Sequence, residues 1–463
     1  MRSLEWVNNM NMTSWWFSWD DLRWPADDVI VRWEKRADTY EKIGVTAVTT
    51  FGFHLRWDWL NYFDKYDAML RSVVEICHAR GIKVVDHHSN QLTHLVRSHE
   101  DRVRIANMQD HHLPLFPDFW DNQNINGKNL SDWRMISVKT NEPIYIESYC
   151  ASAFCPNNPD YQEEYYTYLN RLIKNTGVDG VMSDDTNFFP DFYACGCKYC
   201  RDKFEKRTGV PLPAVDDLSF WENFSSPLFQ EWIDMRFDSV DDFYDGVKKA
   251  LPSGVVLYAC SCSDALPHKV MRGGSMELWA KSMDIIFAEM YHAFGLEDHL
   301  DDIICDLAMV TSIADYHGKK ALVLAYSDDI EVLKEWAMLC ENYGARPWFC
   351  RQVRKVPIIL EEETLKCGYP EVKVDVALPY RCGIVYSRSL KNRLGPIDLS
   401  YYESFKEIVI KMHNSGIRPQ IILDDSLPGN LPYDTIYAPM YDKLNSEIKQ
   451  YLTKTKCTIR TEL

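Results

Sequence analysis

Short apolar runs alternate with longer stretches of helical spacing along most of this sequence, and this alternation limits the possible folds more than any other feature. Gly44 and Gly81 follow two of the helical stretches, as C-terminal caps do. Strands that alternate with helices predict a parallel sheet with right-handed crossovers. The expected strands are 15–20, 47–54, 82–88, 177–185, 255–262, 284–291, 321–328 and 346–352, and the expected helices include 28–43, 65–80, 159–174, 298–317 and 330–343.

Eight such strands are the number found in a closed (β/α)₈ TIM barrel, which we expect to span residues 1–370. An open doubly wound sheet is the rival, but no glycine-rich phosphate loop follows an early strand. Two insertions, 89–159 and 191–252, interrupt the repeat. The first is rich in Asn, Asp, Trp and His, and a loop of this length is usually functional, so we expect it to form one wall of a pocket.

The strand–helix pattern starts again in residues 371–463, which predicts a second domain. A small Rossmann-like α/β fold, of the flavodoxin or amidotransferase type, fits this pattern. The segment lacks GxGxxG, so no dinucleotide is expected. The expected strands are 383–386, 420–423, 434–439 and 457–460, and the expected helices are 401–414 and 446–453.

The charge balance argues against two classes of partner. With 51 Lys and Arg against 68 Asp and Glu the net charge is −17, which repels nucleic acid and anionic membranes. The N-terminus has no signal-peptide pattern, and no apolar window is long enough for a membrane span. We therefore expect a cytoplasmic protein whose cysteines are free thiols or metal ligands rather than disulfides.

A cysteine cluster has the spacing of a metal site. Cys195, Cys197 and Cys200 form C-x-C-x₂-C, and three thiolates this close can converge on one tetrahedral zinc ion. The fourth ligand must come from elsewhere, with Cys155 as the candidate and Cys150 as the alternative. A site with four thiolates would be structural and would fasten the two insertions together.

Paired acids end the strand at 177–185, where barrel enzymes carry their catalytic groups. Glycosidic cleavage needs two carboxyl groups, and Asp184 and Asp185 offer the first. The second is Glu289 or Asp328, each close to a later strand end. Glu289 lies among apolar residues, which would raise its pKa and suit a general acid.

Other polar and aromatic residues gather at expected strand ends and are candidates for substrate binding. A metal-dependent hydrolase or isomerase that uses Asp86, His87 and His88 is one alternative, although adjacent histidines on a strand diverge. Trp348 is either a platform for a sugar ring or a core residue. The substrate-binding candidates are His54, Trp57, Asp86, His87, His88, Asp328 and Trp348.

The order Cys155-Pro-Asn-Asn-Pro, helix, strand ending in acids, and C-x-C-x₂-C resembles glycoside hydrolase family 42, the β-galactosidases. The resemblance implies zinc ligation by Cys155, Cys195, Cys197 and Cys200, and it gives Asp185 the acid/base role. Residues 381–463 look like a short form of the family's trimerisation domain, which implies a homo-oligomer, either trimer or dimer.

The sequence also departs from family 42. The strand ending in Leu324-Ala325-Tyr326-Ser327-Asp328 lacks the family's nucleophilic Glu, so β-galactosidase activity is not implied. Residues 61–87 resemble uncharacterised barrel hydrolases related to α-L-fucosidases, which implies Asp185 or Asp184 as nucleophile and Glu289 as acid/base. We expect a retaining exo-glycosidase acting on oligosaccharides or glycosides. The alternative to an enzyme is a carbohydrate-binding pseudoenzyme.

Overall fold

A computed structural model describes residues 4–107, 124–262, 264–290, 296–326, 330–350 and 377–462. The chain divides into two compact units. The first unit comprises Met1–Lys206, Asp242–Cys260 and Phe349–Tyr369. The second unit comprises Arg207–Asp241, Ser261–Trp348 and Pro370–Leu463.

An eight-stranded sheet has the order β10-β11-β12-β1-β2-β3-β8-β9. The pairs from β1 through β2, β3 and β8 to β9 are parallel, as is β10 with β11. Parallel strands with intervening helices in this order are consistent with a (β/α)₈ barrel, as predicted. The strands are β1 (Met12–Trp16), β2 (Ala47–Phe51), β3 (Lys83–Ser89), β8 (Gly180–Asp184), β9 (Val256–Tyr258), β10 (Ile285–Met290), β11 (Lys320–Tyr326) and β12 (Ala345–Cys350).

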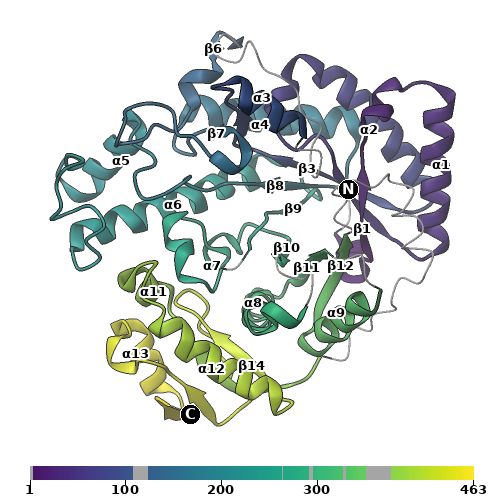
Figure 1. Cartoon of the computed structure of the whole chain (residues 1–463). Helices are drawn as coiled ribbons and strands as arrows, with labels where there is room; N and C mark the ends of the chain where they lie inside the picture. The colour runs from purple at the N-terminus through teal and green to yellow at the C-terminus, as the bar shows by residue number, and fades with distance from the viewer. Residues whose placement is uncertain are drawn as a thin grey trace. The chain divides into compact units, whose positions relative to one another are not determined.

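The helices of the first unit include α1 (Asp27–Lys42), α2 (Phe63–His78) and α4 (Pro159–Thr176) (Figure 1). Helix α2 contacts β3 and lies against both α1 and α4. Helix α4 begins where the Asn158 side chain accepts backbone N–H groups, and it ends at Gly177, whose φ of +79° suits glycine. Strand β8 begins three residues after Gly177 and ends at Asp184.

The first strand lies earlier in the chain than the sequence predicts. Residues 15–20 were expected, but β1 is Met12–Trp16. Trp19–Arg23 forms a 3₁₀ turn instead, because Ser18 and Asp21 cap it reciprocally through side chain and backbone. Because the tryptophans in this stretch are apolar, a prediction based on hydrophobicity extends the strand over the capping residues and places it too late.

The insertions contain regular elements of their own. In the first, β4 (Leu92–His94) pairs antiparallel with β7 (Ala151–Ala153), and α3 (His99–Asn107) follows β4. The short strands β5 (Asn124–Ile125) and β6 (Lys128–Asn129) also pair. The second insertion is largely helical, with α5 (Lys198–Thr208) and α6 (Pro227–Ala250).

The second unit contains a four-stranded parallel sheet in the order β14-β13-β15-β16. Helix α8 (Leu296–Tyr316) packs against both β14 and α12. Most of the expected boundary near 370 lies outside the described residues. The other elements are α7 (Met276–Trp279), α9 (Ile330–Tyr343), β13 (Tyr380–Val385), α11 (Arg388–Leu394), α12 (Ser400–Asn414), β14 (Arg418–Ile422), β15 (Thr435–Tyr437), α13 (Ser446–Lys454) and β16 (Thr458–Arg460).

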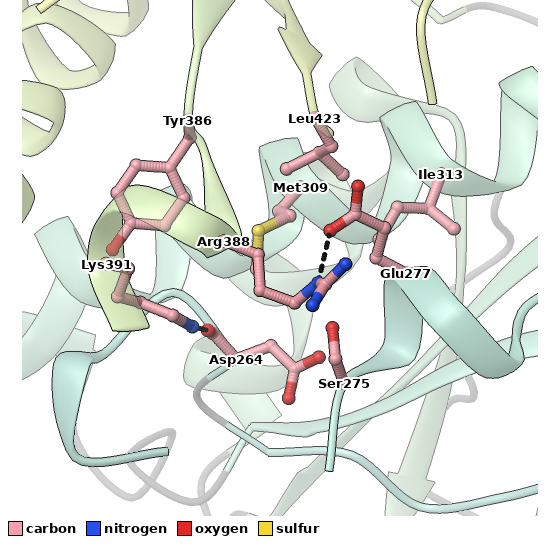
Figure 2. A pocket seen from close by; sticks show the side chains of 9 residues that line it. All are labelled: Asp264, Ser275, Glu277, Met309, Ile313, Tyr386, Arg388, Lys391 and Leu423. Carbon is pink, nitrogen blue, oxygen red and sulfur yellow. Dashed lines mark hydrogen bonds and ion pairs between the residues drawn. The ribbon is translucent and has the colours of Figure 1, made fainter. Parts of the chain in front are cut away.

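A cavity of about 10 Å³ in the second unit is surrounded by buried charged groups (Figure 2). Arg388 Nε lies 3.4 Å from Glu277 Oε2, and Lys391 Nζ donates to the Asp264 carbonyl at 2.6 Å. Burial raises the pKa of Glu277 to about 8, although the Arg388 guanidinium opposes the rise. The volume suits a single water molecule.

Glu277 makes stability depend on pH. Its folded pKa of about 8 exceeds the ordinary value of 4.5, so the stability it contributes in protonated form is lost as pH rises from about 5 to 8. We expect Glu277→Gln to flatten this decline, measured by thermal unfolding of the whole chain across that range. Exposed Glu335 on α9 provides the control, and Glu335→Gln should keep the wild-type slope. A Glu277→Gln variant with the wild-type slope would contradict the assignment.

Candidate active site

The carboxyl ends of three neighbouring strands in the first unit bring His54, His87, Asp184 and Asp185 together. Strand β8 runs parallel to β3 with Ser89 opposite Asp184, and His87 lies two positions earlier on β3. His54 follows β2, and its carbonyl accepts the Ser89 backbone N–H at 2.8 Å. Parallel pairing thus places these side chains at the same edge of the sheet, as the sequence predicted for barrel chemistry.

The four side chains form two imidazole–carboxylate pairs. His54 Nε2 lies 2.9 Å from Asp185 Oδ2, and His87 Nε2 lies 3.0 Å from Asp184 Oδ2. The imidazole rings lie 4.7 Å apart between centroids. Both histidines are buried, whereas the two carboxylate side chains are 16% and 15% exposed. The two acids are therefore slightly more exposed than the histidines that they contact.

The backbone of Asp185 explains why both acids reach this cluster. Adjacent residues of a regular strand point to opposite faces, so strand geometry alone would let only one of the two acids face the pocket. Asp185 has a φ of +66°, outside the strand conformation, and its N–H donates to Asp184 Oδ1 at 2.7 Å. Non-glycine residues adopt this left-handed region at a cost, and such strain concentrates at functional sites.

The pKa values of Asp185 and His87 are both lowered, but for different reasons. Burial alone would raise the pKa of Asp185, but hydrogen bonds from His54 and from the Ser89 side chain lower it below its ordinary value. Burial holds the pKa of His87 well below that of free imidazole. Ser89 was not among the site residues predicted from the sequence, although its position directly after His88, at the end of β3, could have identified it.

Asp86 and His88, also predicted to bind substrate, lie in a fully buried network. Both Asp86 oxygens accept from the Arg56 guanidinium, at 3.1 and 3.2 Å, and Tyr66 also donates to Asp86. His88 bridges Asp86 at 2.7 Å and the Tyr165 hydroxyl at 3.0 Å. These contacts engage both side chains inside the protein, so the geometry favours a structural role and does not support a metal site shared by the Asp86-His87-His88 triplet.

The two tryptophans singled out as candidate substrate contacts are core residues in this structure. Trp57 is 1% exposed, and its indole N–H donates to the Asn90 carbonyl at 2.6 Å. Trp348 is fully buried and packs against Phe287, with ring centroids 5.4 Å apart. Neither ring has a free face for a sugar, so the core interpretation holds for Trp348, and the substrate role predicted for Trp57 lacks support.

The predicted partners for the paired acids lie elsewhere in the chain. Glu289 lies on β10 in the second unit, opposite Leu324 of β11, and its backbone N–H donates to Ser261 O at 2.7 Å. Its side chain is half-buried. Asp328 lies outside the described residues. The pairing of Glu289 with Asp185 therefore stays a prediction.

Four cysteines come together as the sequence suggested. Cys155 Sγ lies 3.4 Å from Cys200 Sγ and 3.6 Å from Cys197 Sγ, and Cys195 belongs to the same cluster. This group could hold a metal ion. Cys155 rather than Cys150 thus completes the set. The cluster joins the segment before α4 to the segment after β8, as expected for a link between the two insertions.

The comparisons with known proteins bear on the fold. No family model and no curated protein matches this sequence. In the described residues, no helix is both long and apolar enough to cross a membrane. Solved structures of β-galactosidases are similar to this chain at low sequence identity.

The first, from the Antarctic haloarchaeon Halorubrum lacusprofundi, has a TM-score of 0.67 at 11% identity, covering 96% of this chain and 71% of that one. The enzyme from the psychrophilic Marinomonas ef1 has a TM-score of 0.62 at 12% identity, covering 97% and 75%. Gan42B, a family 42 enzyme from G. stearothermophilus, has a TM-score of 0.66 at 11% identity, covering 97% and 71%. The chain therefore has a barrel fold like that of the glycoside hydrolase family 42 β-galactosidases.

Proposed function

We propose that this protein is a glycoside hydrolase that removes a terminal sugar from oligosaccharides or glycosides. The observation that carries the proposal is the pair of carboxylates, Asp184 and Asp185, at the carboxyl end of β8, each in contact with a histidine from a neighbouring strand. Enzymes with this fold perform their chemistry at that end of the barrel. The similar solved structures named above are β-galactosidases, which supports the same class of reaction.

In the favoured assignment Asp185 is the nucleophile and Glu289 is the general acid and base. The contact with His54 Nε2 holds the Asp185 carboxylate in one orientation, as an attacking group requires. In the family 42 pattern Asp185 would instead be the acid/base. A retaining enzyme has its two carboxyl groups about 5–5.5 Å apart, whereas an inverting enzyme has them about 6.5–9.5 Å apart.

A panel of aryl α- and β-glycosides, incubated with the full chain, tests the proposal. We expect turnover of one anomeric series, with the first-formed sugar retaining its configuration when followed by proton NMR. Inverted product would keep the class but reassign the second carboxylate as a general base. Saturable sugar binding without any turnover would instead identify a carbohydrate-binding pseudoenzyme, and the hydrolase proposal would be abandoned.

We propose zinc as the metal of the four-cysteine cluster. Ligands about 2.3 Å from a tetrahedral zinc lie about 3.8 Å apart, close to the two Sγ–Sγ separations given above. Zinc bound by Cys155, Cys195, Cys197 and Cys200 would have a complete ligand set, and its contribution would be folding energy rather than chemistry.

Cys197→Ser tests the zinc assignment. We expect the purified variant to lose one equivalent of zinc and to unfold at a lower temperature, because a ligand is lost from a closed site. Metal analysis by mass spectrometry and thermal unfolding measure the two effects. Cys150→Ser is the matched control, since Cys150 is buried but outside the cluster. Equal zinc content in Cys197→Ser and wild type would refute the assignment.

We further propose that residues 371–463 form a short Rossmann-like domain that mediates a homo-oligomer, either trimer or dimer, and that the protein works in the cytoplasm. The parallel four-stranded sheet with α12 and α13 supports the domain. The cysteines in the described part of the chain form no disulfide, in keeping with a reducing compartment. Light scattering of the purified chain decides the oligomeric state.

A further inference from the structure

The donor atoms of two histidines and an aspartate of the first unit lie close together. His54, His87 and Asp184 each offer one nitrogen or oxygen, and these atoms lie within 4.8 Å of one another. Asp184 ends β8, His87 lies two residues before the end of β3, and His54 follows the end of β2 by three residues; the three strands are neighbours in the sheet. Strands hold side chains more rigidly than loops, so at least the His87 and Asp184 donors are positioned before any ligand arrives.

The spacing suits a small cation as well as a hydrogen bond. His87 Nε2 and Asp184 Oδ2 are 3.0 Å apart. Nitrogen and oxygen ligands bound at about 2.0–2.2 Å in octahedral or tetrahedral geometry lie about 3.0–3.5 Å from each other. Little movement is therefore needed to place an ion in contact with both atoms.

Asp185 supplies the support that ligating histidines normally have. A histidine bound to a metal usually directs its other ring nitrogen at a carboxylate, which fixes its tautomer and orientation. Asp185 Oδ2 lies 2.9 Å from His54 Nε2, and the left-handed backbone of Asp185 turns the carboxylate to this position. With Nε2 in contact with Asp185, His54 would bind the ion through Nδ1, and Asp185 would be its outer carboxylate partner.

We propose that His54, His87 and Asp184 form a binding site for a divalent transition-metal ion, separate from the four-cysteine cluster. Two imidazoles and one carboxylate suit ions such as zinc, manganese or iron(II), and they exclude magnesium and calcium as preferred occupants. Three protein ligands leave coordination positions open, and neighbouring hydroxyl groups of a sugar or another polyol can fill them. The site does not depend on glycoside cleavage and is tested without it.

Cobalt titration of the chelator-treated full chain separates the two sites, because only thiolate ligands give sulfur-to-cobalt charge-transfer absorption. We expect two equivalents to bind, one with this absorption and one without it. His87→Ala and the nearly isosteric Asp184→Asn should each remove the second equivalent or weaken it more than about 100-fold, beyond the 10–100-fold typical of an outer partner. Both should keep the charge-transfer band, and an unchanged thermal unfolding temperature shows that the variants fold.

The matched control is His78→Ala, which breaks a histidine–aspartate pair with a 2.7 Å contact to Asp179, just before β8. It should bind two equivalents like the wild type. Binding of a single equivalent by the wild type, with the charge-transfer band, would overturn the proposal. Unchanged binding by Asp184→Asn would overturn it too. Glycosidase activity without a second metal would leave the proposed function intact and reject this site alone.

Discussion

Asp185→Asn should lower the rate of aryl glycoside hydrolysis by about 10⁴-fold or more, as the loss of a nucleophile does in other enzymes. The amide has nearly the same shape and can still contact His54, but it cannot form the glycosyl–enzyme bond. Steady-state kinetics on the best substrate from the aryl glycoside panel measure the effect. Because the substitution is nearly isosteric, we expect unchanged thermal unfolding, so that the loss reports on chemistry.

The leaving group distinguishes the two roles open to Asp185. A nucleophile is needed for every substrate, whereas a general acid is needed least when the leaving phenol is already acidic.

The control for the Asp185→Asn variant is Asp179→Asn, which removes a carboxylate hydrogen-bonded to His78 just before β8, away from the acidic end of that strand. Comparable loss in both variants would point to a folding defect. Wild-type activity in Asp185→Asn would remove Asp185 from the mechanism.

Arg56→Met should lower the free energy of unfolding by about 3–5 kcal/mol, the usual cost of breaking a buried ion pair. The Arg56 guanidinium contacts both oxygens of Asp86, the Tyr66 hydroxyl and the His87 carbonyl, and Arg56 and Asp86 are almost completely buried. Although burial opposes both shifts, the Asp86 carboxylate raises the pKa of Arg56, and the Arg56 guanidinium holds the pKa of Asp86 below its ordinary value. Methionine leaves the carboxylate buried without its main counter-charge. Urea unfolding measures the change.

Two comparisons make the Arg56 result interpretable. Arg80→Met breaks an ion pair with the exposed Asp38, and it should cost less than about 1 kcal/mol. Combining Arg56→Met with Asp86→Asn removes the uncompensated charge, so the double variant should be more stable than Arg56→Met alone. A loss below about 1 kcal/mol for Arg56→Met would show that the network contributes little to stability.

Most of the regular elements could be predicted from hydrophobic periodicity. Helix α9 matches the expected 330–343, and α4 and α12 differ from expectation by two residues or fewer at each end. These helices have clear terminal residues and strong amphipathic spacing. The pairing of β4 with β7 could not be foreseen, because 56 residues separate the ends of the two strands and neither has more than three residues. Local pattern carries no information on such partners.

The site was predictable in its composition but not in its pairing. His54, His87, Asp184 and Asp185 were all identified as strand-end residues, and parallel order was enough to bring them together. Which imidazole meets which carboxylate depends on the φ of +66° at Asp185, and the sequence carries no sign of it. The same limit applies to Trp57 and Asp86, whose residue types suggest sugar contacts although the structure buries both.

Zinc binding by the four-cysteine cluster, as proposed above, would affect how the nascent chain folds. All four cysteines lie between positions 155 and 200, so an ion can be captured before the ribosome has made the rest of the protein. Holding Cys155 against Cys200 closes a loop across a separation of 45 residues, and such a crosslink removes conformational entropy worth about 4 kcal/mol from the unfolded chain. Helix α4 and strand β8 lie inside that loop. Zinc supply during translation would therefore govern how early this part of the protein becomes resistant to proteases.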